Sequence, residues 1–321
     1  MKTARCLVCC ESTTDPAYHP RCAKKLFGTS HPPVLEFAPK EIENLAKQLI
    51  KSHVAIPGVQ RKISLALRSQ ESGTSRLTIM GVLGGTHILK PPSVDYPELP
   101  ELEHITMRLA ESSGIDTAPN GLITLGDGSR AYIVKRFDRY TRGKKLAVED
   151  LCQLSELPSE SKYRGSTESA GKIVRKYSHN PGDDALRFFE LILFSFLTGN
   201  SDMHLKNFSL LENKENTLGL SPAYDLLATQ LLINDPEESA LTINGKRSRL
   251  RREDFQALGK SLKIPESVLE KTINRQLELQ VEWLRLMDNS FLSEKMKEQL
   301  ASLISERRKR LMLHRGNSAV I

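Results

Sequence analysis

The 321-residue sequence lacks the features that identify several large protein classes. It contains no internal repeat, no low-complexity tract and no G-x-x-x-x-G-K-[ST] motif, so neither a repeat protein nor a P-loop NTPase is expected. The most apolar stretch, residues 188–197, includes a glutamate and a serine and is too short to cross a bilayer, which takes about 20 apolar residues. The first residues show no apolar core of a signal peptide. We therefore expect a globular, cytoplasmic protein with no membrane partner.

Cysteine is scarce and unevenly placed. The chain has five cysteines, and four of them lie within the first 22 residues. An odd number concentrated at one end does not suit a disulfide framework, so a reducing compartment is expected. Cys6, Cys9, His19 and Cys22 have spacings that a tetrahedral Zn²⁺ site can use. A set of buried thiols beside a loop histidine explains the same pattern, and the sequence leaves both interpretations open.

The net charge of +7 comes from 46 lysines and arginines against 39 acidic residues, and it favours acidic partners. The densest basic runs are KRSRLRR at residues 246–252 and RRKR at residues 307–310. They could contact tRNA, operator DNA or an acidic protein, or form a solvated loop and the polar face of a helix. No aromatic residues for base stacking lie between the basic ones, so direct nucleic-acid binding is the weaker interpretation.

The order of patterns predicts an α+β protein with three parts: a Cys-rich head (residues 1–30), a sheet-rich part (31–138) and a larger helical part (139–321). Short β-rich runs at residues 54–68, 75–81 and 86–92 predict an antiparallel sheet, and an Asp-Gly turn predicts a hairpin after residue 120. Apolar spacing predicts helices over residues 40–52, 100–110 and 183–198. The polar residues 155–172 predict a loop.

The strongest chemical signal is GNSDMHLKN, residues 199–207, directly after the predicted helix of residues 183–198. Asp202 precedes Asn207 by five positions, and Asp225 follows eighteen positions later. One carboxylate can accept the proton of an attacking hydroxyl, while an amide and a second carboxylate can hold Mg²⁺ on nucleotide phosphates. A polar loop that caps the helix is the structural alternative.

Two upstream elements fit the same chemistry. Lys90 ends a predicted strand, where its ammonium group can reach the phosphates of a nucleotide, and Glu103 lies on the next predicted helix, where it can hold the lysine. The turn at residues 55–62 could cap phosphates with the backbone N–H groups around Gly58. Each element alone is commonplace, and only the complete set favours a phosphotransfer site.

These motifs resemble the HipA-like serine/threonine kinase toxins of bacterial type II toxin–antitoxin systems. The resemblance rests, in chain order, on IPGVQRK, THILKPP, LEHITMRLAESSG, VKRFDRY, VEDLCQL, GNSDMHLKNFSLL and AYDLLAT, and it covers roughly residues 50–235. The length resembles the short HipT-like branch (HipBST type), in which a separate small protein stands in for a subdomain of longer members. The resemblance implies a bilobal protein-kinase-like fold, with a small β-rich N-lobe and a larger helical C-lobe.

The resemblance also implies roles for individual residues. Asp202 would be the catalytic base, and Asn207 and Asp225 would bind Mg²⁺. Lys90 would contact the phosphates of ATP, with Glu103 as its partner. The remaining implied ATP-binding residues are Pro57, Gly58, Val59, Gln60 and Lys62 over the phosphates, Lys135 and Phe137 at the adenine, Asp138 near the ribose, and His204, Lys206 and Tyr224 along the nucleotide.

One position departs from the family pattern. Members often carry an autophosphorylated serine three positions before the glycine, and this chain has Ala55 there. We therefore expect no phosphoryl group at residue 55 and a Gly58 turn that is ordered inward.

The resemblance further implies an aminoacyl-tRNA synthetase of the glutamyl or tryptophanyl type as substrate, a DNA-binding antitoxin and a small accessory antitoxin. A lipid or small-molecule kinase and a pseudokinase regulator are the alternatives. The full set of Lys90, Asp202, Asn207 and Asp225 argues against the pseudokinase.

Overall fold

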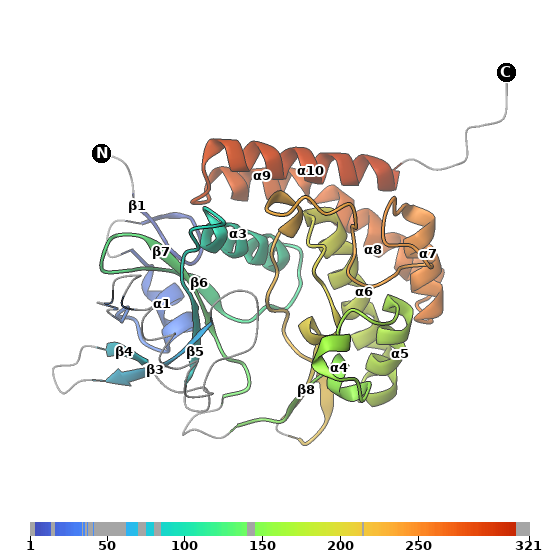
Figure 1. Ribbon diagram of the computed structural model, residues 1–321, viewed down its shortest axis with the longest axis horizontal. Coiled ribbons are helices and arrows are strands. Elements are labelled where there is room, and N and C mark those ends of the chain that lie inside the picture. The colour runs from blue at the N-terminus through green and yellow to red at the C-terminus, as the bar shows by residue number, and fades with distance from the viewer. Residues whose placement is uncertain are drawn as a thin grey trace. The chain divides into compact units, whose positions relative to one another are not determined.

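The computed structural model describes residues 4–13, 17–33, 35, 37, 41, 62–69, 75–79, 85–139, 145–213 and 215–312. They form helices and antiparallel sheets (Figure 1), which confirms the α+β class. Two compact units result: Met1–Arg108, Ala118–Lys145 and Leu286–Leu292 in the first, and Leu109–Thr117, Leu146–Arg285 and Ser293–Ile321 in the second. Apart from residue 41, the helix predicted over residues 40–52 lies outside the described residues, as do Ala55 and Gly58.

A five-stranded antiparallel sheet organises the first unit. Its strands, in spatial order, are β4 (Ser75–Ile79), β3 (Ile63–Ser69), β5 (His87–Lys90), β7 (Arg130–Lys135) and β6 (Asn120–Thr124). The predicted hairpin is confirmed: β6 and β7 are joined by a turn in which Gly128 adopts a φ of 85° and Ser129 donates to the Asp127 carboxylate. A glycine is needed there because a Cβ disfavours positive φ. The register places Lys90 opposite Tyr132.

The Cys-rich head folds into a short hairpin and one helix. Strand β1 (Ala4–Arg5) pairs with β2 (Ser12–Thr13), and helix α1 (Pro20–Phe27) follows. The helix begins with proline, whose fixed φ suits a first turn, and ends at Gly28 in the left-handed conformation. Its apolar face, with Leu26 and Phe27, is buried.

Helix α3 (Leu99–Ser112) confirms the helix predicted from the apolar spacing over residues 100–110. Leu102, Ile105 and Leu109 are each fully buried, as that spacing requires for one helix face. The chain leaves the helix through Gly114, whose φ of 82° disfavours a side chain.

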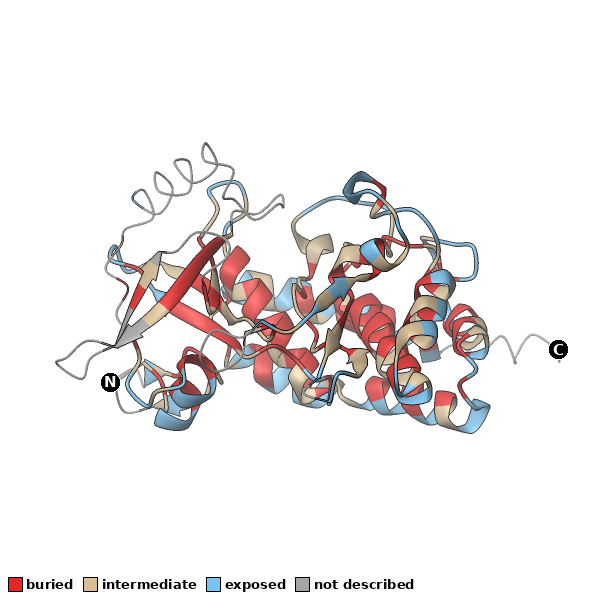
Figure 2. Cartoon of the chain, turned by 90° about the horizontal axis from the view of Figure 1, so that it is seen from below, coloured by how far each residue is buried: buried red, intermediate tan, exposed pale blue. Residues whose placement is uncertain are grey.

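The second unit is mainly helical. Its elements are β8 (Val148–Asp150), α4 (Leu151–Leu154), α5 (Thr167–Tyr177), α6 (Pro181–Thr198), β9 (Ser209–Glu212), β10 (Leu218–Leu220), α7 (Arg252–Ser261), α8 (Glu266–Glu278) and α10 (Glu294–Met312), while α9 (Gln280–Asp288) contributes its first part. Helix α6 is buried on nearly every side, and buried segments (red in Figure 2) extend through the helices of this unit. Trp283 is 1% exposed and packs edge-on against Phe194, so it lies in the core of this unit.

One local prediction was wrong. Residues 155–172 are not one loop, because α5 begins at Thr167 with the Ser166 side chain capping the N–H of Ser169. In the two basic runs, Arg252 and Arg307 are buried, with 5% and 3% of their surface exposed. Arg252 pairs with Glu270 and Arg307 lies 3.5 Å from Glu238, so packing inside the unit uses part of this charge. Within the described residues, no helix has the length and apolar character to span a membrane.

Candidate active site

The loop after α6 is held in place by its own backbone. Gly199 takes the left-handed conformation that ends the helix, and the Asn200 N–H returns to the Ser195 carbonyl at 2.8 Å. The Asp202 carbonyl accepts the His204 N–H and the side-chain amide of Asn207, both at 2.9 Å. A carbonyl can only accept, so the Asn207 group that faces it is Nδ2, and Oδ1 remains available as a ligand.

The Asp202 carboxylate accepts a hydrogen bond from the Tyr163 hydroxyl at 2.8 Å. Burial raises the pKa of Tyr163 above its usual value, and the hydrogen bond and charge of Asp202 raise it further. The phenol therefore stays protonated and remains a donor at neutral pH. Its ring meets the His204 ring edge-on, with centroids 5.1 Å apart.

His204, Lys206 and Tyr224 lie around the same loop. His204 is 6% exposed, and burial lowers its pKa despite the attraction of Asp202, so the imidazole is neutral at pH 7. Lys206 Nζ lies 3.2 Å from Ser159 Oγ and 3.4 Å from Asp150 Oδ2. The Tyr224 hydroxyl donates to the Lys206 carbonyl at 2.9 Å.

Asp225 is positioned by its neighbours. The Tyr224 bond to Lys206 ties its segment to the loop that carries Asn207, and the Ala223 N–H donates to the Asp116 carbonyl at 2.7 Å. Asp225 itself has a φ of 59°, a left-handed conformation that aspartate and asparagine tolerate better than most residues. Asn207 Oδ1 and the Asp225 carboxylate are hard oxygen ligands, the kind that Mg²⁺ prefers, so this donor set fits the ion.

In the first unit, Lys90 and Glu103 form a deeply buried ion pair. Their side chains are 4% and 1% exposed, and the Lys90 ammonium group donates to Glu103 Oε1. The ammonium nitrogen also lies 5.4 Å from the centre of the Tyr132 ring. Removing two charges from water costs about as much free energy as their mutual attraction provides. Such a pair therefore adds little to the stability of the fold. The contact suits a lysine that is held in place for a ligand.

The end of β7 and the segment that follows it carry the residues predicted to contact adenine and ribose. The Lys135 N–H donates to the Pro119 carbonyl at 2.8 Å, and Phe137 is half-buried. Asp138 accepts both Nε and Nη2 of Arg136, at 2.9 and 2.8 Å, and also Nη1 of Arg139. Burial alone would raise the pKa of Asp138, but the two arginines outweigh it and hold the pKa below its usual value. The carboxylate oxygens are thus already engaged by arginine.

Lys62, the one described residue of the predicted phosphate turn, is half-buried just before β3. Pro57, Gly58, Val59 and Gln60 lie outside the described residues, so their predicted contacts with phosphate stay predictions.

Residues 54–283 match the model of the HipA-like C-terminal domain family. The chain belongs to this family. A Sinorhizobium fredii protein named "Putative kinase Y4mE" is 34% identical over 209 residues, which cover 63% of this chain and 48% of that protein. The serine/threonine-protein kinase toxin HipA of Shewanella oneidensis is 27% identical over 213 residues, which cover 60% of this chain and 47% of that protein. The chain thus spans about half the length of these curated relatives.

The HipA-like fold is also evident from a solved structure. The Shewanella oneidensis toxin–antitoxin complex of HipA, HipB and operator DNA contains a chain that superposes with a TM-score of 0.69 at 21% sequence identity. The match covers 87% of this chain and 72% of that chain. The family resemblance seen in the sequence is therefore confirmed, while the short HipT-like branch stays a prediction.

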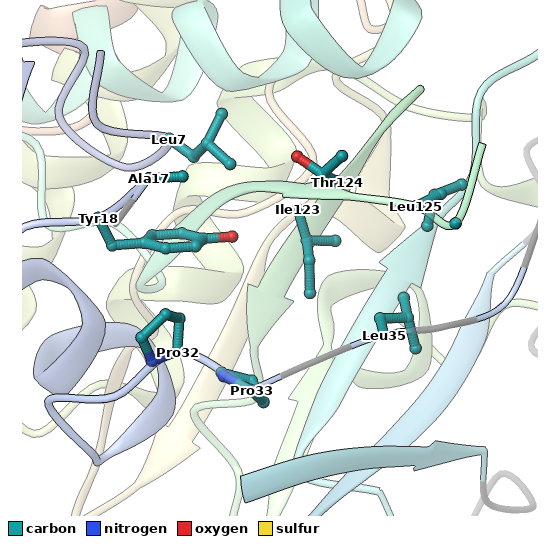
Figure 3. Close-up of a pocket in the computed structure, with 10 residues that line it drawn as sticks. Leu7, Ala17, Tyr18, Pro32, Pro33, Leu35, Ile123, Thr124 and Leu125 are labelled. Atoms are coloured by element: carbon teal, nitrogen blue, oxygen red, sulfur yellow. The ribbon is translucent and has the colours of Figure 1, made fainter. Parts of the chain in front are cut away.

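A separate hollow of about 580 Å³ lies in the first unit of this HipA-like chain (Figure 3). It is lined by the head (Leu7, Ala17, Tyr18), the following link (Pro32, Pro33, Leu35) and the β6–β7 hairpin (Ile123, Thr124, Leu125, Gly126). None of these residues was predicted to bind nucleotide, and the lining carries no charged side chain.

Tyr163 is the residue that sequence reasoning missed. It lies in the polar stretch that was predicted to be a loop, 39 positions before Asp202. No spacing rule links a tyrosine to a carboxylate at that separation, so only the fold reveals the contact.

Proposed function

We propose that this chain is an ATP- and Mg²⁺-dependent protein serine/threonine kinase with the bilobal arrangement of that fold. The observation that carries the proposal is the bond from Asn207 Nδ2 to the Asp202 carbonyl. It ties the Asn207 side chain to the backbone of Asp202, five positions earlier, and leaves Asn207 Oδ1 available to a metal. Membership of the HipA-like family supports the same activity, because relatives in it are named kinases.

In the proposed reaction, Asp202 accepts the proton of a serine or threonine hydroxyl while the oxygen of that hydroxyl bonds to the γ-phosphorus of ATP. The bond between that phosphorus and the bridging oxygen breaks, and ADP leaves. Bound Mg²⁺ would neutralise charge on the phosphates, with Asn207 and Asp225 as its protein ligands. Lys90, held by Glu103, would contact the phosphates.

The other ATP contacts belong to the same proposal. The turn of residues 57–62 would cover the phosphates, and the main chain of Lys135 and Phe137 would meet the adenine, with Asp138 near the ribose. His204, Lys206 and Tyr224 would line the nucleotide from the catalytic loop.

We further propose that the kinase acts in the cytoplasm as the toxin of a toxin–antitoxin system. Its substrate would be an aminoacyl-tRNA synthetase of the glutamyl or tryptophanyl type, and phosphorylation would arrest translation. A DNA-binding antitoxin and a small accessory antitoxin would neutralise it. The relative solved with HipB and operator DNA supports partners of this kind.

The proposal is tested by incubating the purified chain with γ-¹⁸O-labelled ATP in two separate samples, one with a bacterial lysate and one with phosphoinositide vesicles. Mass spectrometry should find one dominant labelled serine or threonine in a synthetase, and the Asp202→Asn variant should leave it unlabelled. Labelling of phosphoinositide vesicles instead would favour a lipid kinase. ATP binding with no labelled product in either sample would contradict kinase activity and favour a pseudokinase.

A further inference from the structure

The head of the first unit brings four metal-ligand side chains together. The ligand atoms of Cys6, Cys9, His19 and Cys22 all lie within 4.8 Å of one another. A tetrahedral Zn²⁺ ion with Zn–S bonds of about 2.3 Å and a Zn–N bond of about 2.0 Å holds its sulfur and nitrogen ligands about 3.5 Å apart. His19 Nδ1 lies 3.2 Å from Cys9 Sγ and 4.0 Å from Cys22 Sγ, values on either side of that distance.

The orientation of His19 points to a metal rather than to hydrogen-bonded thiols. Its Nε2 lies 3.0 Å from the Ser12 carbonyl, which can only accept, so Nε2 carries the proton. Nδ1 therefore directs a single lone pair at the sulfurs. One lone pair can accept from only one thiol, whereas one metal ion satisfies every member of the cluster. A histidine ligand fixed by a carbonyl on its other nitrogen is the usual outer-shell arrangement of zinc sites.

The segments that carry these ligands also hold the head against the rest of the unit. Leu7 and Val8, between Cys6 and Cys9, accept hydrogen bonds through their carbonyls from the Leu122 N–H at 2.7 Å and from His104 Nε2 at 2.9 Å. Tyr18, next to His19, donates its hydroxyl to the Leu122 carbonyl at 2.7 Å.

Helix α1 adds a further bond of this kind, because the Leu26 carbonyl accepts His87 Nε2 at 2.9 Å. His104 is adjacent to Glu103 on α3, and His87 begins β5, which ends at Lys90. The head is thus bonded directly to the two elements that carry the buried ion pair.

We propose that Cys6, Cys9, His19 and Cys22 bind one Zn²⁺ ion, and that this ion locks the head against β5 and α3. The site is structural, with four protein ligands and no open position. Its role is to hold the backbone carbonyls of the head in register with His87 and His104. The metal proposal does not depend on the kinase activity.

Metal analysis of the full chain, purified from zinc-supplemented cells and passed through gel filtration, tests the site. One zinc per chain is expected in the wild type, and less than a tenth of that in Cys6→Ser and Cys22→Ser. Cys10→Ser is the matched control, because Cys10 adjoins Cys9 but lies outside the cluster, and it should retain its zinc. Zinc retained at full occupancy by Cys6→Ser and Cys22→Ser would overturn the ligand set.

Substitutions of His19 distinguish a metal ligand from a residue that only makes structural hydrogen bonds. His19→Gln keeps a donor for the Ser12 carbonyl and should lose zinc, whereas His19→Cys removes that donor, restores a fourth ligand and should retain it. If the opposite pattern is found, the imidazole is not a ligand.

A measurement on the unmodified chain covers the case in which variants fail to fold. Reduced, metal-free protein titrated with Co²⁺ should develop the intense visible absorption and the sulfur-to-cobalt charge-transfer bands of a tetrahedral thiolate site, at one equivalent. Absence of both zinc in the purified protein and Co²⁺ uptake would overturn the proposal, as would disulfides within the cluster in protein purified under reducing conditions.

Hydrogen exchange tests the locking role without any assay of activity. Removing zinc with a chelator should raise amide exchange at least tenfold in α1, β5 and the first turns of α3, while α7 and α8 in the second unit stay unchanged. Exchange that rises only within residues 4–27 would leave a metal site but overturn its role in holding β5 and α3.

Discussion

Tyr163 donates its hydroxyl to Oδ1 of Asp202 at 2.8 Å, although 39 residues separate the two. The bond holds the carboxylate in one orientation from a different part of the second unit. A net contribution of about 1 kcal/mol for such a bond corresponds to about fivefold in rate if it acts through the orientation of the base.

We predict that Asp202→Asn lowers phosphoryl transfer by more than a thousandfold, because an amide cannot accept the proton of the substrate hydroxyl. The variant should unfold at the same urea concentration as the wild type, since Asp202 is only partly buried. Transfer rates to the acceptor protein that the lysate experiment identifies, and unfolding curves on the same enzyme samples, check both parts. A rate within tenfold of the wild type would exclude Asp202 as the base.

Tyr163→Phe should lower kcat about fivefold and leave the KM for ATP unchanged, because it removes the bond to Asp202 and keeps the ring against His204. Loss of packing alone would instead change the unfolding transition and leave kcat intact. The variant thus separates a residue that positions the base from one that only fills space.

Asp225 offers a substitution that spares the backbone. Its φ of 59° is tolerated by asparagine, whereas alanine there costs about 1 kcal/mol of strain. We predict that Asp225→Asn keeps the wild-type free energy of unfolding but weakens Mg²⁺-dependent ATP binding at least tenfold, as titration calorimetry at several Mg²⁺ concentrations can show. Equal Mg²⁺ dependence in variant and wild type would contradict the ligand assignment.

The buried pair of Lys90 and Glu103 predicts a strongly coupled double-mutant cycle. Lys90→Met or Glu103→Leu alone leaves one buried charge without its partner and should cost about 3 kcal/mol or more in urea unfolding. The double variant should return to within about 1 kcal/mol of the wild type, because two apolar side chains replace the pair. It should nevertheless remain inactive, which separates stability from phosphate binding.

A pair with an exposed glutamate provides the control for this cycle. Lys297 and Glu294 lie 2.8 Å apart, and their side chains are 12% and 84% exposed. Removing the charge of the exposed Glu294 should change the free energy of unfolding by less than about 1 kcal/mol. Single variants of Lys90 and Glu103 that behave like this Glu294 variant would contradict the burial argument.

Much of the fold could be predicted because its signals are local. The apolar spacing of α3 and the Asp127–Gly128 turn both act within a few residues, and both predictions were confirmed. The prediction failed at residues 155–172, because the polar composition of this stretch indicated a loop. The local signal for a helix there is a single capping serine, Ser166 at the start of α5, and it was interpreted as part of the loop.

The same distinction between local and long-range signals applies to the candidate site. The loop of residues 199–207 was identified because its residues are close in the sequence. Tyr163 and the arginine contacts of Asp138 were missed because they depend on long-range packing or on rotamers. Composition left the role of the basic runs open for a related reason: it counts charges but does not show that Arg252 and Arg307 pair with carboxylates.

His87 makes the first unit sensitive to acid. Burial lowers its pKa to about 4, outweighing the hydrogen bond to the Leu26 carbonyl. The unfolded chain, with a histidine pKa of about 6.5, therefore binds more protons than the folded chain between pH 6.5 and 4. The stability that this histidine contributes is complete above pH 6.5 and is lost as the pH falls toward 4.

We predict that the free energy of unfolding falls by about 2 kcal/mol more in the wild type than in His87→Gln between pH 7 and pH 5. The reason is that each pH unit over which only the unfolded chain binds this proton costs about 1.4 kcal/mol. Glutamine can still donate to the Leu26 carbonyl but does not titrate. Urea unfolding of both chains at the two pH values measures the difference, and any loss of metal from the head at low pH affects both alike. Equal losses in the two chains would show that His87 is not the group that binds the proton.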